Sequence, residues 1–261
     1  MEFKGKVVAI TGAAGGIGQA LSRWFGGQGA CIAAIDKSET VRDFARALAG
    51  EGINADSAVL DHADDAAVAA AFRKFDASLG PTDILVNNAG FSGVPTLEVT
   101  SPADFRRLVE GNASGAFYCA HAVLPAMKTR KSGVIINIGS VNGFSALGDP
   151  AYSVGKAGLF ALTQALAMEY GRFGIRANMV APGTVRTPIW EERMARNPEV
   201  LERLKRWYPL RRVVEPVDVA RAVGFLASDA AAAITGVVLP VDCGLSAGNI
   251  VMARELTLED F

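Results

Sequence analysis

Short runs of apolar and β-branched residues recur along the chain and are separated by segments long enough for helices. The runs predict strands at Val7–Thr11, Cys31–Asp36, Ala58–Asp61, Ile84–Asn87, Val134–Ile138, Arg176–Val180 and Val237–Val241. Strands that are apolar on both faces and alternate with helices indicate a parallel sheet covered on both sides. With right-handed crossovers, this pattern predicts an α/β fold, a doubly wound parallel sheet of about seven strands, in a single domain over residues 1–261.

Charge, hydropathy and histidine content exclude three classes of protein. The 26 Lys and Arg residues balance 27 Asp and Glu residues, a formal charge of −1, whereas a chain that coats nucleic acid or an anionic membrane needs clustered excess cations. No run approaches the roughly 18 apolar residues of a membrane span. His62 and His121 have no ligand partners at a telling spacing, so we interpret them as surface or structural residues. We expect no nucleic acid, no membrane, no metal and a small-molecule substrate.

Cysteine usage indicates a reducing compartment. Cys31, Cys119 and Cys243 lie in apolar stretches without zinc-like spacing, which predicts buried, reduced thiols. The segment Met1–Gly5 leads directly into the first predicted strand, which leaves no room for a signal peptide. We therefore expect a cytoplasmic protein.

A glycine-rich turn follows the first predicted strand, in the sequence Thr11-Gly12-Ala13-Ala14-Gly15-Gly16-Ile17-Gly18. Between a strand and a helix, glycines let the chain bend sharply, let the backbone approach a pyrophosphate, and let the helix pack closely on the sheet. The N–H groups and the dipole of the following helix also favour phosphate. We predict dinucleotide binding by Gly12, Gly16, Ile17 and Gly18.

Polar residues end the next three predicted strands. Asp36 closes the second, where a carboxylate accepts hydrogen bonds from an adenosine ribose and repels a 2′-phosphate; the alternative is a helix-capping acid. No Arg or Lys lies within residues 11–18 to offset that repulsion, so we predict NAD in preference to NADP, with Lys37 able to support some phosphate binding. Asp61 is predicted to reach the adenine, and Asn88 belongs to a small turn against the cofactor.

Tyr152 and Lys156 lie four residues apart at the start of a predicted helix. One turn, about 6 Å of rise, separates them, so both side chains share a face. A free Tyr has a pKa near 10 and is a poor base at neutral pH, but an adjacent ammonium favours the phenolate. We expect Lys156 to lower the pKa of Tyr152 for proton exchange with an alcohol or ketone, with Ser140 holding the substrate oxygen. Taken alone, such a pair is also common on protein surfaces.

Together these motifs resemble those of a known family. They are Thr11-Gly12-xxx-Gly16-x-Gly18, Asn87-Asn88-Ala89-Gly90, Asn112, Ser140, Tyr152-xxx-Lys156 and Pro182-Gly183-xxx-Thr187. In this order and spacing, the chain resembles the short-chain dehydrogenase/reductase family over nearly its whole length. The resemblance implies a Rossmann fold and an oxidoreductase that acts on CH–OH groups by hydride transfer. Ser140 and Tyr152 are one residue closer than in many members, a difference in the loop that lines the substrate pocket.

The resemblance also implies a role for each motif residue. Tyr152 would be the general acid/base, Ser140 would polarise the substrate oxygen, and Lys156 would bind the nicotinamide ribose. Asn112 would hold a water that connects Lys156 to solvent as a proton relay. The implied cofactor contacts, the last two at the carboxamide end of the nicotinamide, are Gly12, Gly16, Ile17, Gly18, Asp36, Asp61, Asn88, Tyr152, Lys156, Val185 and Thr187.

Two other functions are compatible with the same fold. A catalytically silent dinucleotide-binding sensor does not need the complete set of Asn112, Ser140, Tyr152 and Lys156. A sugar-nucleotide epimerase or dehydratase of the related type has a longer chain and a differently spaced glycine motif. The sequence therefore favours an NAD-dependent oxidoreductase that interconverts a secondary alcohol and a ketone.

A charged segment interrupts the alternating pattern at about 188–215. Between Trp190 and Glu215, 12 of 26 residues are charged. The segment is either a solvated surface helix or a mobile substrate lid, and its position after the sixth predicted strand favours the lid.

Substrate contacts are predicted for Ser140, Asn142, Tyr152 and Trp190. Polar groups beside an aromatic wall suit a polyol, a sugar or a small hydroxylated ring. The alternative substrate is a 3-oxoacyl thioester, whose carrier would bind the seven Lys and Arg residues of the charged segment, although five acids are interleaved with them.

Assembly is implied mainly by the resemblance. Family members are commonly tetramers that pair the two long helices around Ser101–Arg130 and Tyr152–Phe173, and we expect a homotetramer. These helices carry more apolar residues than one sheet face needs, among them Phe105, Leu108, Phe117, Phe160, Leu162 and Leu166. The C-terminal segment at about 244–261 continues beyond the last strand and is predicted to be an arm on a neighbouring subunit rather than a disordered end.

Overall fold

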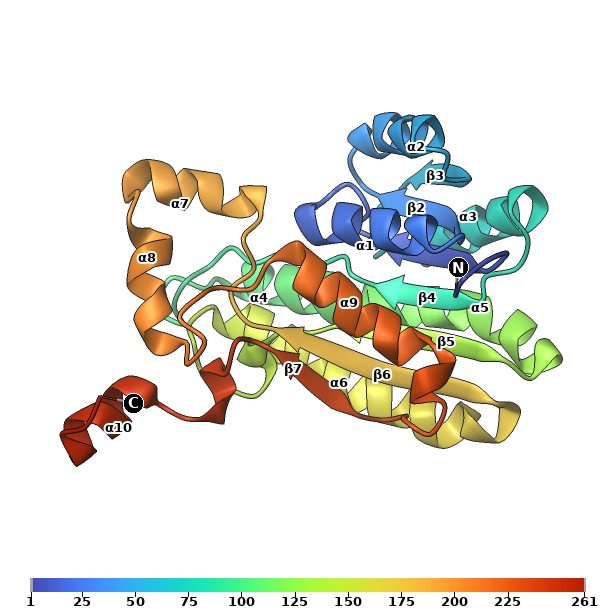
Figure 1. Cartoon of the computed structure of the whole chain (residues 1–261). Helices are drawn as coiled ribbons and strands as arrows, with labels where there is room; N and C mark the ends of the chain where they lie inside the picture. The colour runs from blue at the N-terminus through green and yellow to red at the C-terminus, as the bar shows by residue number, and fades with distance from the viewer. Residues whose placement is uncertain (1, 261) are drawn as a thin grey trace.

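The computed structural model describes residues 2–260, and within them seven strands form one parallel sheet (Figure 1). The strands are β1 (Val7–Thr11), β2 (Cys31–Asp36), β3 (Ala55–Val59), β4 (Ile84–Asn87), β5 (Gly133–Ile138), β6 (Ile175–Pro182) and β7 (Val238–Val241). Their order in the sheet is β3-β2-β1-β4-β5-β6-β7, and neighbouring strands run parallel. The predicted doubly wound α/β architecture is confirmed.

Helices cover both faces of this sheet. The first face carries α1 (Gly16–Gly27), α2 (Thr40–Gly50) and α9 (Pro216–Ala227), and the second carries α3 (Asp65–Ser78), α5 (Gly115–Arg130) and α6 (Pro150–Tyr170). Successive strand residues alternate between the two cores: Val8 and Ile10 pack on the first, and Ala9 packs on the second. This alternation is the period of an extended chain, and it explains why β1 and β2 carry apolar residues on both faces.

A chain of buried polar side chains crosses the middle of the sheet. Asn87 at the end of β4 donates from Nδ2 to Oδ1 of Asn137 in β5, at 2.9 Å, and the two residues are direct partners in the strand register. Asn137 in turn donates from Nδ2 to Oγ1 of Thr163 in α6, at 2.8 Å. The amides therefore tie two strands to the helix that covers them.

The long helical segment before β5 is not continuous. Helix α4 (Pro102–Val109) begins after Ser101, whose hydroxyl accepts a hydrogen bond from Asp104 N. A π-helical turn, Glu110–Ser114, then separates α4 from α5. In a π turn the backbone hydrogen bonds run from i to i+5, and such turns are frequent at functional sites.

Two expectations from the sequence are corrected. The third strand is Ala55–Val59, not Ala58–Asp61, because its pairing with β2 runs from Ile32–Ala55 to Asp36–Val59. This edge strand contains the polar residues Asp56 and Ser57, so its first half does not form an apolar run in the sequence. The three cysteines are free as expected, but Cys31 is only partly buried.

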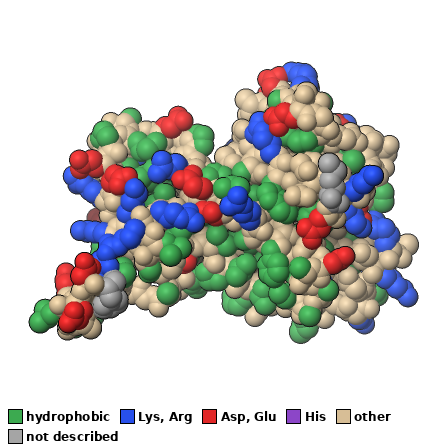
Figure 2. All heavy atoms as spheres, in the orientation of Figure 1, with side chains coloured by type: hydrophobic (Ala, Val, Ile, Leu, Met, Phe, Trp, Pro, Cys, Tyr) green, Lys and Arg blue, Asp and Glu red, His purple; other side chains and the backbone are tan. Residues whose placement is uncertain are grey.

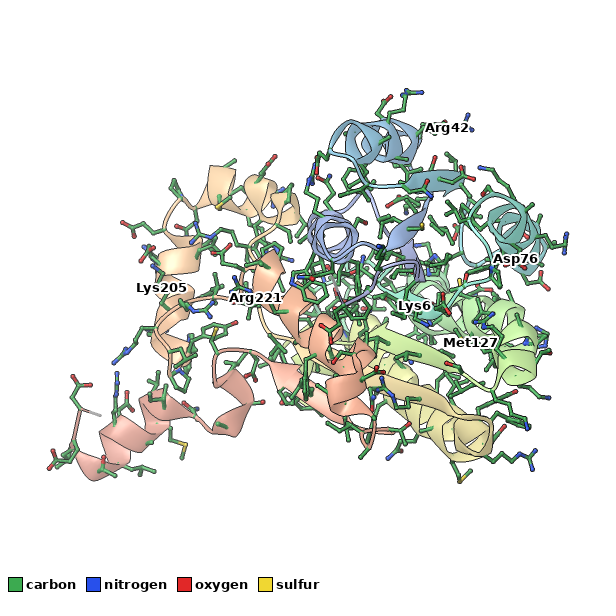
Figure 3. The ribbon with its side chains drawn as sticks, turned by 45° about the vertical axis from the view of Figure 1, so that its right-hand side comes forward. Lys6, Arg42, Asp76, Met127, Lys205 and Arg221 are labelled. Atoms are coloured by element: carbon green, nitrogen blue, oxygen red, sulfur yellow. The ribbon has the colours of Figure 1, made fainter. Side chains whose placement is uncertain are left out.

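The charged segment forms a separate block beside the sheet. It contains α7 (Glu191–Arg196) and α8 (Val200–Leu204), and α10 (Ile250–Thr257) lies below it near the C-terminus (Figure 1). In Figure 3, Lys205 marks this block, while Arg42 and Asp76 mark α2 and α3 on the opposite side of the molecule. Across residues 2–260, we find no helix with the length and apolarity that crossing a bilayer requires.

Candidate active site

A cleft of about 1180 Å³ opens at the carboxyl ends of the strands. It is centred where β1 and β4 lie side by side although two further strands separate them in the sequence. In doubly wound sheets this switch in strand order is where ligands bind, because the connections leave toward opposite faces and a crevice stays open. Figure 2 shows the surface hollowed between the α7–α8 block and the main body.

The glycine turn forms one end of the cleft, and its backbone leaves no room for side chains. Gly12 has φ +64°, and a Cβ there would lie 3.0 Å from Asn88 Nδ2. A Cβ on Gly16 would lie 2.8 Å from Thr187 Cγ2, and one on Gly18 would lie 2.1 Å from Gly12 O. Gly12, Gly16 and Ile17 line the cleft, whereas Gly18 lies behind the turn.

The polar strand-end residues hold this turn in place. Asn88 Nδ2 donates to the carbonyl oxygens of Thr11 and Gly12, at 3.0 and 3.1 Å. Asp36 accepts from Ala14 N through Oδ2 and from Ser38 N through Oδ1, each at 3.0 Å. Each carboxylate oxygen keeps a further lone pair, and the Asp36 side chain lines the cleft.

Asp61 lies further along the same edge and also lines the cleft. Its Oδ1 accepts a hydrogen bond from Ala63 N at 3.0 Å. Lys37 lines the cleft as well, with its ammonium 5.0 Å from the centre of the Phe91 ring. The predicted adenosine end thus combines carboxylates with a cation that lies on an aromatic face.

Tyr152 and Lys156 both face the cleft from the first turns of α6. The Lys156 ammonium is buried, donates to Ile138 O at 2.8 Å, and lies 5.6 Å from the centre of the Tyr152 ring. Ser140 follows β5, and its Oγ accepts a hydrogen bond from Asn142 N at 3.2 Å. The side chains of Tyr152, Lys156 and Ser140 thus lie together at the end of β5.

Burial dominates the protonation of this cluster. It raises the pKa of Tyr152 above 10.0, a hydrogen bond with Ser140 lowers it in part, and the Asp149 carboxylate raises it further. Burial lowers the pKa of Lys156 to about 8. The expected lowering of the Tyr152 pKa by Lys156 is therefore wrong for this structure, because loss of hydration disfavours the phenolate and the ammonium is bonded to the Ile138 carbonyl.

Asn112 lies in the π turn, behind the wall of the cleft rather than on its surface. Its Nδ2 donates to Leu108 O and Phe91 O, each at 2.8 Å, and its Oδ1 accepts from Phe91 N at 3.2 Å. A Cβ on Gly90 would lie 2.6 Å from Asn112 Oδ1 and 2.9 Å from Lys156 Nζ. The amide and the ammonium therefore converge on the bare backbone of Gly90.

The opposite end of the cleft is lined by polar, aromatic and aliphatic side chains. The residues predicted to lie near the nicotinamide and the substrate all line this end, namely Val185, Thr187, Trp190 and Asn142. Asn142 Nδ2 donates to Gly148 O at 3.2 Å. The structure brings every predicted site residue to the cleft or, for Gly18 and Asn112, directly behind its wall.

Several residues of the cleft were missed from the sequence. Among them are Phe91 and Asn249, whose positions depend on how loops fold over the strand ends. His62, interpreted as a surface or structural residue, has a mostly buried side chain and also lines the cleft.

The residues present fit a dinucleotide. The cradle formed by Gly12 and Gly16 is one that a Cβ would fill, and the N-terminus of α1 follows it with N–H groups suited to phosphate. Among residues 2–260, no group of three or more His, Cys, Asp or Glu side chains is placed to hold a metal ion.

Comparison with known proteins gives consistent matches over the whole fold. The family model described as "Enoyl-(Acyl carrier protein) reductase" matches residues 12–246. A Schizosaccharomyces pombe protein, "Uncharacterized oxidoreductase C922.06", is 44% identical over 263 residues, covering 100% of this chain and 98% of its own. "Cis-4-hydroxycyclohexanecarboxylate dehydrogenase" of Sinomonas cyclohexanicum is 36% identical over 247 residues, covering 94% and 98%.

Solved structures agree with these matches. An oxidoreductase of the short chain dehydrogenase/reductase family from Burkholderia thailandensis superposes with a TM-score of 0.93, at 49% identity over 98% of each chain. An NAD+-bound xylitol dehydrogenase superposes with a TM-score of 0.87, at 29% identity, over 92% of this chain and 99% of its own.

Proposed function

The chain belongs to the short-chain dehydrogenase/reductase family, whose members use nicotinamide dinucleotides, and we propose that it interconverts a secondary alcohol and a ketone with NAD. The observation that carries the proposal is the meeting of Tyr152, Ser140 and Lys156 in the cleft beside the glycine turn. A binding protein without catalysis would not need a buried ammonium next to a buried phenol, since burying both is costly.

In the proposed mechanism, the substrate oxygen lies between Tyr152 and Ser140. When bound, the nicotinamide ring supplies hydride exchange with the carbon that carries this oxygen. As a phenolate, Tyr152 takes the proton from the alcohol, and as a phenol it gives a proton to the ketone oxygen during reduction. Ser140 Oγ donates a hydrogen bond to the same substrate oxygen. Lys156 holds the ribose of the cofactor, and Asn112 connects Lys156 to solvent through a water.

We propose NAD over NADP because Asp36 lines the cleft at the predicted ribose position. A 2′-phosphate there would meet a carboxylate whose two oxygens already hold the turn through Ala14 N and Ser38 N. Moving that carboxylate away would release the turn. Gly12, Gly16, Ile17, Gly18, Asp61, Asn88, Val185 and Thr187 complete the proposed cofactor site.

For the substrate we propose a polyol, a sugar or a small hydroxylated ring, held by Ser140, Asn142, Tyr152 and Trp190. Among relatives whose names give a substrate, three act on a hydroxylated ring acid, a hydroxysteroid and xylitol, and one acts on a succinyl-CoA derivative. The 3-oxoacyl thioester alternative is less well supported, because cations of the charged segment pair with neighbouring acids. Arg203 pairs with Glu199 and Lys205 with Glu202, which leaves less charge for a carrier.

We further propose that residues 188–215 are a lid. Its base is closed by a bridge between Val185 and Val214 and by an ion pair of 3.1 Å between Arg186 and Glu215. Leu201 and Tyr208 anchor it in the protein, while Ile189 is largely exposed at the cleft. A segment that is held at its two ends and by two buried side chains, and that presents an exposed side chain at the cleft, is suited to closing over a bound substrate.

We propose that residues 1–261 form a single domain, that the protein is cytoplasmic, and that four copies of the chain assemble into a homotetramer. The large apolar side chains of Phe117 on α5 and of Phe160 and Met168 on α6 are exposed and would be covered in such an assembly. Leu108 and Leu166, counted with them from the sequence, lie in the core instead. Met252, Leu256 and Leu258 are exposed on the proposed C-terminal arm at 244–261, of which residue 261 lies outside the described residues.

The test is turnover of polyols, aldoses, hydroxy-steroids and acetoacetyl thioesters with NAD(H) and NADP(H), for the native chain and for Tyr152→Phe. We expect NAD to give the higher kcat/KM with a hydroxylated substrate. Tyr152→Phe should lower kcat at least about 100-fold and leave NADH binding, followed by fluorescence, within about two-fold.

Tyr170→Phe, at the other end of α6, is the matched control and should keep the native kcat. A native-like kcat in Tyr152→Phe would remove Tyr152 from its role, and no turnover of any alcohol or ketone with either cofactor, despite NADH binding, would favour the sensor. A preference for the thioester would overturn the substrate proposal alone.

A further inference from the structure

His62 is the one histidine whose side chain is mostly buried, among the residues that the structure describes. It follows Asp61 at the predicted adenosine end and lines the cleft. Its ring also reaches the π turn that precedes α5. His62 Nε2 lies 3.1 Å from Gly111 O. A carbonyl oxygen only accepts hydrogen bonds, so Nε2 carries the proton and donates it.

The second contact of the ring is with Gly115. A Cβ on Gly115 would lie 2.0 Å from His62 Cδ2, so the imidazole fits only against bare backbone. Gly111 is the second residue of the π turn Glu110–Ser114, and Gly115 follows its last residue. His62 therefore bonds one end of this turn and packs on the other.

The π turn carries Asn112. On the other side of the turn, a Cβ on Gly111 would lie 2.4 Å from Phe91 Cε1, and Asn112 bonds the Phe91 backbone in both directions. The turn is thus held between the imidazole and the phenyl ring. The Asn112 amide and the Lys156 ammonium both lie against the backbone of Gly90. A shift of the π turn would therefore move the amide away from both residues.

Burial of the ring favours a neutral imidazole. It lowers the pKa of His62, and Lys156 and Lys37 add to the lowering, whereas Asp61, at 3.7 Å from Nδ1, and the bond to Gly111 oppose it. The bond to Gly111 O places the proton of the neutral ring on Nε2.

We infer that His62 is a positioning residue that fixes the π turn, and with it Asn112, from the adenosine end of the cleft. The inference rests on the proposed function, because it acts through the proton relay assigned to Asn112. It predicts a link between two parts of the site that lie far apart along the chain: loss of the imidazole affects proton transfer more than cofactor binding.

The test compares His62→Leu, which keeps an apolar volume but donates nothing, with His62→Gln, whose amide can donate to Gly111 O. We expect kcat to fall about 10-fold in His62→Leu, with KM for NAD and for the alcohol within about two-fold, since small displacements of catalytic groups are costly. His62→Gln should recover most of the loss. His121→Leu, at an exposed histidine on α5, is the control and should keep the native kcat.

An unchanged kcat in folded His62→Leu, or an equal loss in His62→Gln, would overturn the inference. If His62→Leu does not fold, His62→Asn replaces it, because its shorter amide does not reach the Gly111 oxygen. Asn112→Ala and Tyr152→Phe separate the two proposals. Loss of turnover in both, with native turnover in His62→Leu, would reject the role of His62 alone, whereas native turnover in Tyr152→Phe would reject the proposed function.

Discussion

The two ends of the cleft are built on different principles. At the cofactor end, bare backbone at Gly12, Gly16 and Gly90 meets neighbouring atoms so closely that even a methyl group is excluded. At the substrate end, the lid presents exposed side chains such as Ile189 and short helices, one of which carries two surface ion pairs. Steric necessity fixes the first end, while the second can change side chains at small cost to the fold.

This difference teaches where specificity can vary within one scaffold. A site that must accept the same dinucleotide is set by backbone positions, which tolerate little change. A wall that recognises a particular alcohol is set by side chains on a segment anchored by only a few buried residues, among them Leu201 and Tyr208. Substitutions at the two ends should therefore differ in both the size and the kind of their effects.

Outside the catalytic side chains, the largest expected effect is that of Gly90→Ala at the cofactor end. The new methyl group would lie 2.6 Å from Asn112 Oδ1 and 2.9 Å from Lys156 Nζ, so both groups must move. We expect kcat to fall about 10- to 100-fold, measured by steady-state kinetics. Gly93→Ala, in the same loop and with nothing within 4 Å of its Cβ, should keep native kinetics; equal losses in both variants would show that the loop, not the contact, matters.

A smaller effect, on stability, is expected for Lys156→Met. The pKa of Lys156 is about 8 in the folded chain against 10.5 ordinarily, so the unfolded chain binds more protons between these pH values and stability rises with pH across that window. Below pH 8 the cost of burying the ammonium is fully present. The difference between the two pKa values of Lys156 corresponds to about 3 kcal/mol of unfolding free energy. Replacing Lys156 by Met also removes its hydrogen bond to Ile138 O, which offsets part of this gain.

We therefore expect Lys156→Met to raise the free energy of unfolding by about 1–3 kcal/mol at pH 7, with the gain shrinking as the pH rises from 8 to 10.5. Urea denaturation at pH 7 and at pH 10 measures both values. Lys128→Met, at an exposed position on α5, should show neither the gain nor the pH dependence. A variant less stable than the native chain at pH 7 would contradict the cost assigned to the buried ammonium.

The smallest effect is expected at the lid. Trp190 is partly exposed, lines the cleft and has the Arg193 guanidinium 4.7 Å from its ring centre. Trp190→Ala should raise KM for the alcohol about 3- to 10-fold and change the free energy of unfolding by less than about 0.5 kcal/mol. Leu210→Ala, exposed in the same segment but outside the cleft, is the control. A loss in kcat as large as that of Gly90→Ala would erase the contrast between the two ends.

The sequence predicts the cofactor end well because its signals are local. A strand, a glycine turn and a helix start are readable within a few residues, and Tyr152 and Lys156 are one helical turn apart. Since parallel strands end at the same edge, residues that follow β1, β4 and β5 must meet there. The placement of Asp36, Asn88 and Ser140 at the cleft follows from this rule.

The sequence does not predict what depends on approach between distant segments. His62 reaches Gly111, 49 residues later in the chain, and no local pattern marks that contact. The pKa of Tyr152 depends on how much water the surrounding loops exclude, which a helical spacing does not encode. The bounds of β3 depend on its pairing with β2 rather than on its own composition.

The buried amides of β4 and β5 bear on how the chain assembles. Asn87 and Asn137 are 50 residues apart, and parallel strands so distant in sequence pair slowly. A slip of one residue between these strands would separate the two amides and strand polar groups in an apolar interior, at a cost of about 1–3 kcal/mol each. Only the aligned sheet, in which Asn87 and Asn137 are direct partners, lets one amide bond the other, so this pair penalises a wrong register of β4 and β5 during folding.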